Sequence, residues 1–206
     1  LLKYLDKYHA CAPFIIHNDF IKYLSNKYKI ENNPIMHIQT PQAFRFKTIY
    51  KAHKLTKSNN KKDVAISLLN IGGVYFYKGD INKALDYNFD GLKICEELGD
   101  ERQTAISFSN IGSVYISQAD FDKALDYLYK SNNIHSKIGN QSGLAHTLSN
   151  IGITYHYKGD YEKALNYFKR SLAIREELGD KRGMGGSLNN IGIVYWNKGD
   201  YDKALG

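Results

Sequence analysis

The chain has 206 residues, of which 43% are hydrophobic and 24% are charged, a balance typical of globular proteins. No apolar run approaches the roughly 20 residues of a membrane-spanning helix, and the first residues lack the apolar core of a signal peptide. The net charge of +7 is uneven, because residues 61–206 hold 18 basic and 18 acidic side chains, whereas residues 1–60 hold 10 basic and 3 acidic ones. We therefore expect no membrane and no nucleic acid among its partners. Cys11 and Cys95 are far apart in the sequence and favour a reducing compartment, so we expect a cytoplasmic location.

Residues 1–58 are predicted to form a partial α/β segment. Residues 12–16 and 36–39 have the apolar character of short strands, and residues 42–55 are typical of a helix. The Thr-Pro pair just before this helix marks its start, because proline is favoured at the first helical position.

The start of that helix carries the sequence Thr-Pro-Gln-Ala-Phe at positions 40–44. It resembles a Thr-Pro-Gln-x-Phe motif in the C-terminal part of the methylerythritol-phosphate and ribitol-phosphate cytidylyltransferases, where the motif ends a strand and begins a helix. The resemblance covers about residues 10–55. It does not include the Gly-rich loop with Arg and Lys that holds the nucleotide phosphates in that family. We interpret residues 1–58 as a cytidylyltransferase-like remnant or a joined gene fragment, without catalysis of its own.

From about residue 62 onward, the sequence repeats itself every 40 residues. Each copy contains Asn-Ile-Gly, a Tyr five positions after the Asn, and Asp-x-x-Lys-Ala beginning ten positions after it. A fixed period of this length indicates stacked units that bury their apolar faces on one another. Because the fourth copy ends within the pattern, we interpret the sequence as a fragment of a longer chain. The predicted units are residues 62–100, 101–140, 141–180 and 181–206.

Each unit is predicted to be a pair of helices joined by tight turns. In the first unit a Leu, an Ile, a Gly and a Tyr share one helical face, at the i, i+3, i+4 and i+7 positions that start at Leu68. The Gly of this face recurs in every unit, which indicates a closely packed neighbouring helix. Gly79 can end the first helix in the left-handed conformation, and the following Asp can cap the second. The equivalent of this Gly in the second unit is Ala119, so that turn is expected to be slightly strained.

The positions that the units share are best seen in the third unit: Leu148, Ile151, Gly152, Tyr155, Gly159, Tyr161, Ala164, Phe168 and Ser171. These residues resemble the tetratricopeptide repeat, and the period of 40 residues in place of 34 resembles its kinesin light chain and Leu-Gly-Asn subclass. The resemblance implies an all-α, right-handed helix-turn-helix solenoid over residues 62–206. It also implies a scaffold that binds a protein or peptide and has no catalysis of its own.

In that family the first helix of each pair lines a concave face, so the resemblance places a ligand there. The repeated Asn has two alternative roles on this face. Its carboxamide can clamp the backbone of an extended peptide, as the resemblance implies, or it can bond the neighbouring helix and set the stacking register. Leu69 is also expected to point to this face. The candidate peptide-binding residues are Asn70, Phe76, Tyr77, Asn110, His146, Asn150, His156, Tyr157, Asn190 and Trp196.

The candidate face contains no Lys or Arg, so we expect a ligand that is not strongly acidic and has apolar or aromatic anchors. Instead of contacting a ligand, the aromatic side chains can pack against other side chains within the array. His135, His146 and His156 are expected to be surface histidines that are too far apart to share a metal. Cys95 is expected to be a buried thiol. We predict no cofactor, metal site or catalytic residues.

Two alternative functions stay open beside the scaffold. The chain can be a fragment of a cytidylyltransferase that carries a repeat extension, or its repeats can be the sensor of a larger signalling protein. A Gly-rich loop with Arg and Lys in sequence upstream would favour the first of these alternatives.

Overall fold

The computed structural model describes residues 60–205, and these form eight helices and no strand. The predicted all-α array of helix-turn-helix units is confirmed for this range. The strands and helix predicted within residues 1–58 lie outside the described residues. The helices are α4 (Lys61–Tyr77), α5 (Ile81–Glu97), α6 (Glu101–Ser117), α7 (Phe121–Lys137), α8 (Gln141–Tyr157), α9 (Tyr161–Glu177), α10 (Lys181–Lys198) and α11 (Tyr201–Leu205).

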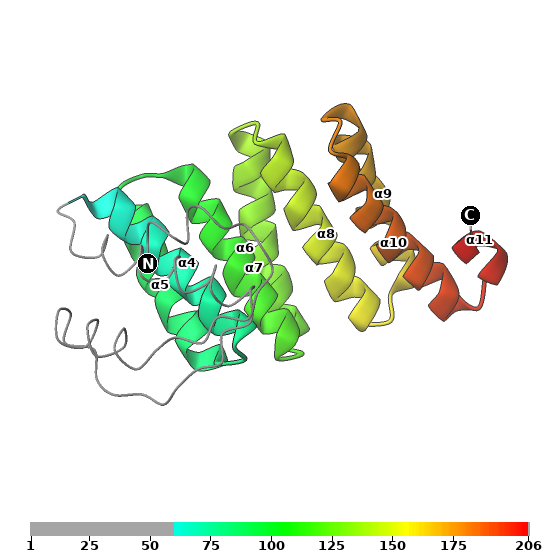
Figure 1. Cartoon of the computed structure of the whole chain (residues 1–206), viewed down its shortest axis with the longest axis horizontal. Coiled ribbons are helices and arrows are strands. Elements are labelled where there is room, and N and C mark those ends of the chain that lie inside the picture. The colour runs from blue at the N-terminus through cyan, green and yellow to red at the C-terminus, as the bar shows by residue number, and fades with distance from the viewer. Residues whose placement is uncertain (1–59, 206) are drawn as a thin grey trace, which may run out of the picture. The chain divides into compact units, whose positions relative to one another are not determined.

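The helices pack in chain order, and Figure 1 shows them side by side from α4 to α11. Each helix contacts the next one along the chain, and the first helices of successive units also touch, as α4 with α6, α6 with α8 and α8 with α10. Every first helix is therefore covered by its own second helix and by its neighbours in the row. Within residues 60–205, every helix falls short of the length and apolarity that crossing a bilayer requires.

Glycine ends the helices at all but one of the tight turns. Gly79 has a φ of +78° and Gly99 has a φ of +64°, in the left-handed region that glycine enters without a steric penalty. Ala119 adopts the same conformation with a φ of +57°, the only non-glycine residue in the described part of the chain to do so. The predicted strain at this turn is confirmed, since the left-handed conformation costs an L-residue with a Cβ roughly 1–2 kcal/mol. Asp80 then caps α5, because its carboxylate accepts the backbone N–H of Lys83 at 3.3 Å.

The recurring Gly on the first helix marks the closest approach within a unit. A Cβ atom added to Gly112 would lie 2.7 Å from Cγ of Leu128, and one added to Gly152 would lie 2.7 Å from Cε1 of Phe168. The predicted close neighbour is confirmed, and it is the second helix of the same unit. Leu128 and Phe168 are both almost fully buried at this crossing.

Three equivalent side chains near the ends of α5, α7 and α9 lie at the junctions between units. Cys95, His135 and Arg175 are only 1%, 2% and 7% exposed. The equivalent positions in the helices that follow them are Gln103, Gly143 and Gly183. A Cβ atom on Gly143 would overlap the imidazole of His135, and a Cβ atom on Gly183 would overlap the guanidinium of Arg175. Glycine thus stands opposite the two larger side chains, and each junction has its own composition.

These junctions confirm one expectation and correct another. Cys95 is a free, buried thiol as expected, and burial raises its pKa. The prediction that His135 is a surface histidine is wrong, because its ring fills the space that Gly143 leaves open, and Nδ1 lies 3.1 Å from Nδ2 of Asn140.

One further side chain differs from its predicted position, and another differs from its equivalent in the third unit. Leu69 is only 4% exposed and packs with Ala65 and Cys95, because α5 and α6 cover that side of α4. Leu188 is 53% exposed, although its equivalent Leu148 is buried. The helix after Leu188 is the five-residue α11, whereas the full-length α9 packs on the helix that carries Leu148.

The crossing at Gly152 supplies a first prediction. Gly152→Ala should lower the free energy of unfolding by about 1–3 kcal/mol, because the new methyl group overlaps the buried ring of Phe168. Gly73→Ala is the matched control, since a Cβ atom there meets nothing within 4 Å and should raise stability by about 0.5–1 kcal/mol. Urea unfolding of both variants checks the pair, and equal effects would show that the crossing tolerates a side chain.

Burial of His135 supplies a second prediction. Burial, with the charge of Arg102 as a smaller cause, holds the pKa of His135 below its ordinary value of 6.5. The unfolded chain takes up a proton near that ordinary value, and the folded chain does so only at lower pH. Stability is therefore fully present above about pH 6.5 and falls as the pH drops toward the folded pKa. His135→Gln should reduce this fall in urea unfolding between about pH 7.5 and 5, and an unchanged pH dependence would contradict the assignment.

Candidate functional site

The four repeated Asn residues lie on equivalent turns of α4, α6, α8 and α10. Asn70 is exposed, and Asn110, Asn150 and Asn190 are half-buried. We call the exposed and half-buried surface around them the Asn face. Its other residues are Gly73, Tyr77, Ser109, Ser113, His146, Ile153, Tyr157, Asn189, Ile193 and Asn197.

Asn150 connects two neighbouring units. Its Nδ2 donates to Oγ of Ser113 at 3.1 Å and lies 3.5 Å from Oγ of Ser109, so it ties α8 to α6. The equivalent bond from Asn190 is missing within residues 60–205, because Ile153 stands where Ser113 stands in the second unit. Whether the Asn fixes the stacking of two units therefore depends on whether the preceding unit has a hydrogen-bonding side chain at this position.

Asn110 makes a different connection. Its Nδ2 lies 3.4 Å from Oδ1 of Asn88, a fully buried side chain on α5. Asn88 in turn donates to the carbonyl oxygen of Ala84 at 2.7 Å. Asn110 thus bonds the second helix of the preceding unit, whereas Asn150 bonds the first helix of the preceding unit.

These bonds use only the amide nitrogen of each Asn. Among residues 60–205, Oδ1 of Asn110 and Oδ1 of Asn150 accept no hydrogen bond. A carboxamide oxygen has two lone pairs that can accept backbone N–H groups. The two alternative roles of the Asn are therefore compatible, because stacking occupies one atom and a ligand can use the other.

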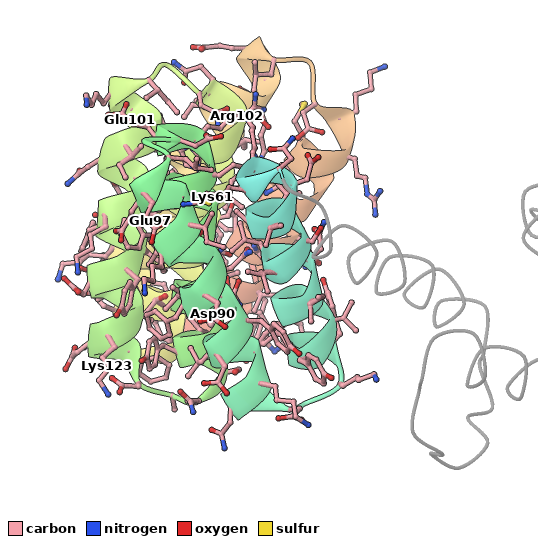
Figure 2. All side chains as sticks on the ribbon, turned by 90° about the vertical axis from the view of Figure 1, so that its left-hand side faces the viewer. Lys61, Asp90, Glu97, Glu101, Arg102 and Lys123 are labelled. Atoms are coloured by element: carbon pink, nitrogen blue, oxygen red, sulfur yellow. The ribbon has the colours of Figure 1, made fainter. Side chains whose placement is uncertain are left out.

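Apart from Arg175 and Asp180, which lie beside His146, the ion-paired side chains lie away from the Asn face. Ion pairs join the ends of the helices, such as Lys61 with Glu97 at 3.3 Å and Lys158 with Asp122 at 2.6 Å. Figure 2 shows Lys61 and Glu97 toward the end at which α4 begins and Lys123 at the opposite end. The Asn face itself carries no Lys, Arg, Asp or Glu, so it offers hydrogen bonds and apolar contacts.

The aromatic candidates gather where the first helices end. Tyr77, Tyr157 and Trp196 are 70%, 61% and 60% exposed. Tyr157 stacks on Phe121 with ring centroids 6.2 Å apart, and Trp196 meets Tyr201 edge-on at 4.9 Å. The half-buried Phe76 contacts the ring of its neighbour Tyr77. These side chains combine large exposed areas with partial support from neighbouring rings.

The two candidate histidines lie apart on α8. His156 is half-buried, its Nε2 lies 3.2 Å from Nδ2 of Asn197, and burial lowers its pKa. His146 lies near the start of the helix, and partial desolvation together with the charge of Arg175 lowers its pKa. In residues 60–205, no three His, Cys, Asp or Glu side chains come together closely enough to hold a metal ion.

The structure also brings a residue to this site that the sequence pattern did not identify. Arg175 is on a second helix, but its guanidinium lines a cavity together with His146. Its position on the buried face of α9 concealed this role. The signal available in the sequence was Gly183, which replaces a larger residue opposite Arg175.

Comparisons with known proteins agree with this geometry. The family model described as tetratricopeptide repeat matches the chain three times, over residues 63–137, 103–177 and 143–206. These matches together span most of the chain and nearly all of the described helical array.

Curated cytidylyltransferases share sequence with part of the chain. The 2-C-methyl-D-erythritol 4-phosphate cytidylyltransferase of Clostridium botulinum (strain Eklund 17B / Type B) is 34% identical over 86 residues, which is 38% of this chain and 38% of the enzyme. The chain thus spans well under half the length of the curated relatives that it matches.

Two solved structures illustrate the shared fold. The Rap protein complexed with competence and sporulation factor superposes with a TM-score of 0.73 at 22% identity, over 80% of this chain and 47% of that chain. A putative kinesin light chain of Podosopora anserina, with nearly identical TPR-like repeats, superposes with a TM-score of 0.60 at 11% identity, over 91% and 87%. At these identities the likeness shows the fold alone.

The bond between Asn150 and Ser113 supplies a prediction on stability. Asn150→Ala should lower the free energy of unfolding by about 0.5–1.5 kcal/mol, the typical net value of one hydrogen bond. Asn190→Ala, which removes no side-chain hydrogen bond within residues 60–205, should change it by less than about 0.5 kcal/mol. A double-mutant cycle with Ser113→Ala isolates the pair, and purely additive effects would contradict the bond.

Proposed function

The chain belongs to the tetratricopeptide repeat family, and we propose that residues 62–206 form a scaffold that binds a protein or peptide and has no catalysis of its own. Residues 1–58 are proposed to be a separate, partial α/β segment. Stacked helical units build extended surfaces on which ligands lie across several repeats. The proposal rests on one observation: the carboxamide oxygens of Asn110 and Asn150 accept no hydrogen bond within the described residues.

The general spacing of packed helices suits an extended peptide as the ligand. Packed helices lie about 8–10 Å apart, and α4, α6, α8 and α10 follow one another in contact. A polyproline II chain has three residues per turn and rises about 3.1 Å per residue, so it presents the same side every ~9 Å. We therefore propose that backbone N–H groups three residues apart donate to successive Asn side chains.

The surroundings of the Asn face define the side chains of the ligand. Because the face is uncharged, a run of acidic residues in the ligand finds no basic partner there. The exposed rings of Tyr77, Tyr157 and Trp196 offer contacts to apolar or aromatic anchors. A protein with this fold, the Rap protein, is known in complex with competence and sporulation factor. The proposed ligand of this chain is an extended, largely uncharged peptide with apolar anchors, bound in the cytoplasm.

Selection from a library of random short peptides, followed by measurement of the dissociation constant, tests the proposal. Asn110→Ala and Asn150→Ala should each weaken a selected peptide about ten-fold, the effect of one lost hydrogen bond. N-methylation of the peptide at one of every three residues should weaken its binding to the wild-type protein by a similar factor. The same methyl group should have no further effect on the Asn variant that it faces.

Two control variants separate binding from folding. Asn166→Ala makes the same chemical change on the exposed side of α9 and should leave affinity within about two-fold. Ser113→Ala removes the bond that positions Asn150 but leaves its Oδ1 in place, so it should lower stability more than affinity. Unchanged affinity in a folded Asn110→Ala, Asn150→Ala double variant would make the Asn residues purely structural.

A second candidate function rests on the similarity to cytidylyltransferases. The match to the Clostridium botulinum enzyme leaves a cytidylyltransferase with a repeat extension as the alternative. Release of pyrophosphate when the purified protein transfers the cytidylyl group of CTP to 2-C-methyl-D-erythritol 4-phosphate would favour that alternative over a scaffold without catalysis.

A further inference from the structure

A cavity of about 260 Å³ lies beside the Asn face, near the start of α8, the end of α9 and the start of α10. Its volume is slightly below the roughly 300–1,000 Å³ of pockets that enclose whole small-molecule ligands. It therefore has room for the end of a larger ligand. The lining residues are Ser142, Ala145, His146, Arg175, Leu178 and Asp180.

Arg175 is the buried charge of this cavity. Its side chain is only 8% exposed, yet its hydrogen bonds are few: Nε donates to Oγ of Ser171 at 3.1 Å, and Nη2 lies 3.4 Å from Oγ of Ser149. Nη1 is 3.8 Å from Oδ2 of Asp180, beyond hydrogen-bond distance. A buried guanidinium with five N–H donors is costly unless carboxylates or other acceptors surround it.

Asp180 does not meet this need, because its carboxylate serves the helix that follows. Oδ1 accepts the backbone N–H of Gly183 at 2.9 Å as the cap of α10. Its side chain is 41% exposed to water, against 8% for Arg175. The guanidinium is the less exposed group of this pair, and its Nη1 has no acceptor within hydrogen-bond distance among the described residues.

The first unit shows what the cavity lacks. There Lys62, at the position equivalent to Ser142, reaches the capping carboxylate of Asp100 at 2.9 Å. Ser142 is too short to make that contact with Asp180. The repeat thus replaces a long basic side chain by a short hydroxyl at one unit, at the same place where it buries an arginine.

We propose that this cavity binds a carboxylate group, with Arg175 as its cationic partner and Ser142 and His146 as hydrogen-bond donors at its rim. Ala145 and Leu178 supply an apolar wall for the residue that carries the carboxylate. The proposal deepens the function proposed above and rests on it for the nature of the ligand, a peptide. His146 is one helical turn before Asn150 on α8, so a peptide on the Asn face has its end or an acidic side chain close to the cavity.

The carboxylate has two possible sources, the C-terminus of a peptide or an Asp or Glu side chain. Nuclear magnetic resonance titration of the intact chain with N-acetyl-leucine, its primary amide and the α-amide of N-acetyl-aspartate separates them. Both carboxylates should shift the resonances of His146 and Arg175, and the tighter of the two identifies the source. The leucine amide should bind about ten-fold more weakly than N-acetyl-leucine, since it lacks the charge-assisted hydrogen bonds. Equal binding of the acid and the amide would overturn the proposal.

Variants locate the site. Arg175→Gln should lower the affinity for N-acetyl-leucine about ten-fold or more. Arg170→Gln, on the exposed side of the same helix, should leave that affinity within about two-fold of the wild type. Ser142→Lys places in the cavity the side chain that Lys62 has in the first unit, and it should abolish binding without unfolding the chain. Stronger binding to Ser142→Lys would mean attraction by surface charge alone and would contradict the pocket.

One further variant separates this proposal from the function on which it rests. Asn150→Ala should leave the affinity for N-acetyl-leucine unchanged, because that small acid reaches the cavity without the Asn face. Loss of peptide binding in Asn150→Ala together with intact N-acetyl-leucine binding supports both proposals. Binding of selected peptides with no response to N-acetyl-leucine overturns the carboxylate pocket alone.

Discussion

The close crossing of the two helices in each unit is the constraint on which the rest of the array depends. At Gly112 and Gly152 the first helix has no side chain, so Leu128 and Phe168 of the second helix pack against its backbone. This contact sets the separation of the helix pair and, through it, the side of the first helix that is left for its neighbours. The Asn residues lie immediately before the Ile-Gly of this crossing. Their exposure follows from its geometry, because the crossing buries the adjoining side.

Much of the helical array could be predicted from its periodicity. Repeated Gly-Asp pairs located the turns, and the recurring Gly located the helix crossing. The prediction for Leu69 is wrong for a physical reason: a helix with one buried face would leave Leu69 outside, whereas α4 is covered by both α5 and α6. A helix that is packed on two sides buries residues about 100° apart, so adjacent apolar residues can both be internal.

The candidate site could be predicted only in outline. Sequence spacing placed Asn110 and Asn150 on one surface, but it could not say which atom of each carboxamide the neighbouring unit uses. That depends on Ser113 and Asn88, which belong to other helices and vary between units. Arg175 escaped prediction because a charged residue on a buried helical face gives no periodic signal. Its role emerges only when the first turn of α10 and the rim of α8 are placed around it.

The junction side chains described above also affect how the chain assembles. Similar units in one chain can pair out of order, which is a common route to misfolding and domain swapping in repeat proteins. Here a helix that ends with His135 or Arg175 fits only against a first turn that contains glycine, and Gln103 cannot offer that space. The side chains at the junctions therefore distinguish the start of the second unit, which has Gln103, from the starts of the third and fourth units, which have Gly143 and Gly183. A unit that ends in His135 or Arg175 is thereby kept from packing on the second unit, while the repeated residues give all units the same shape.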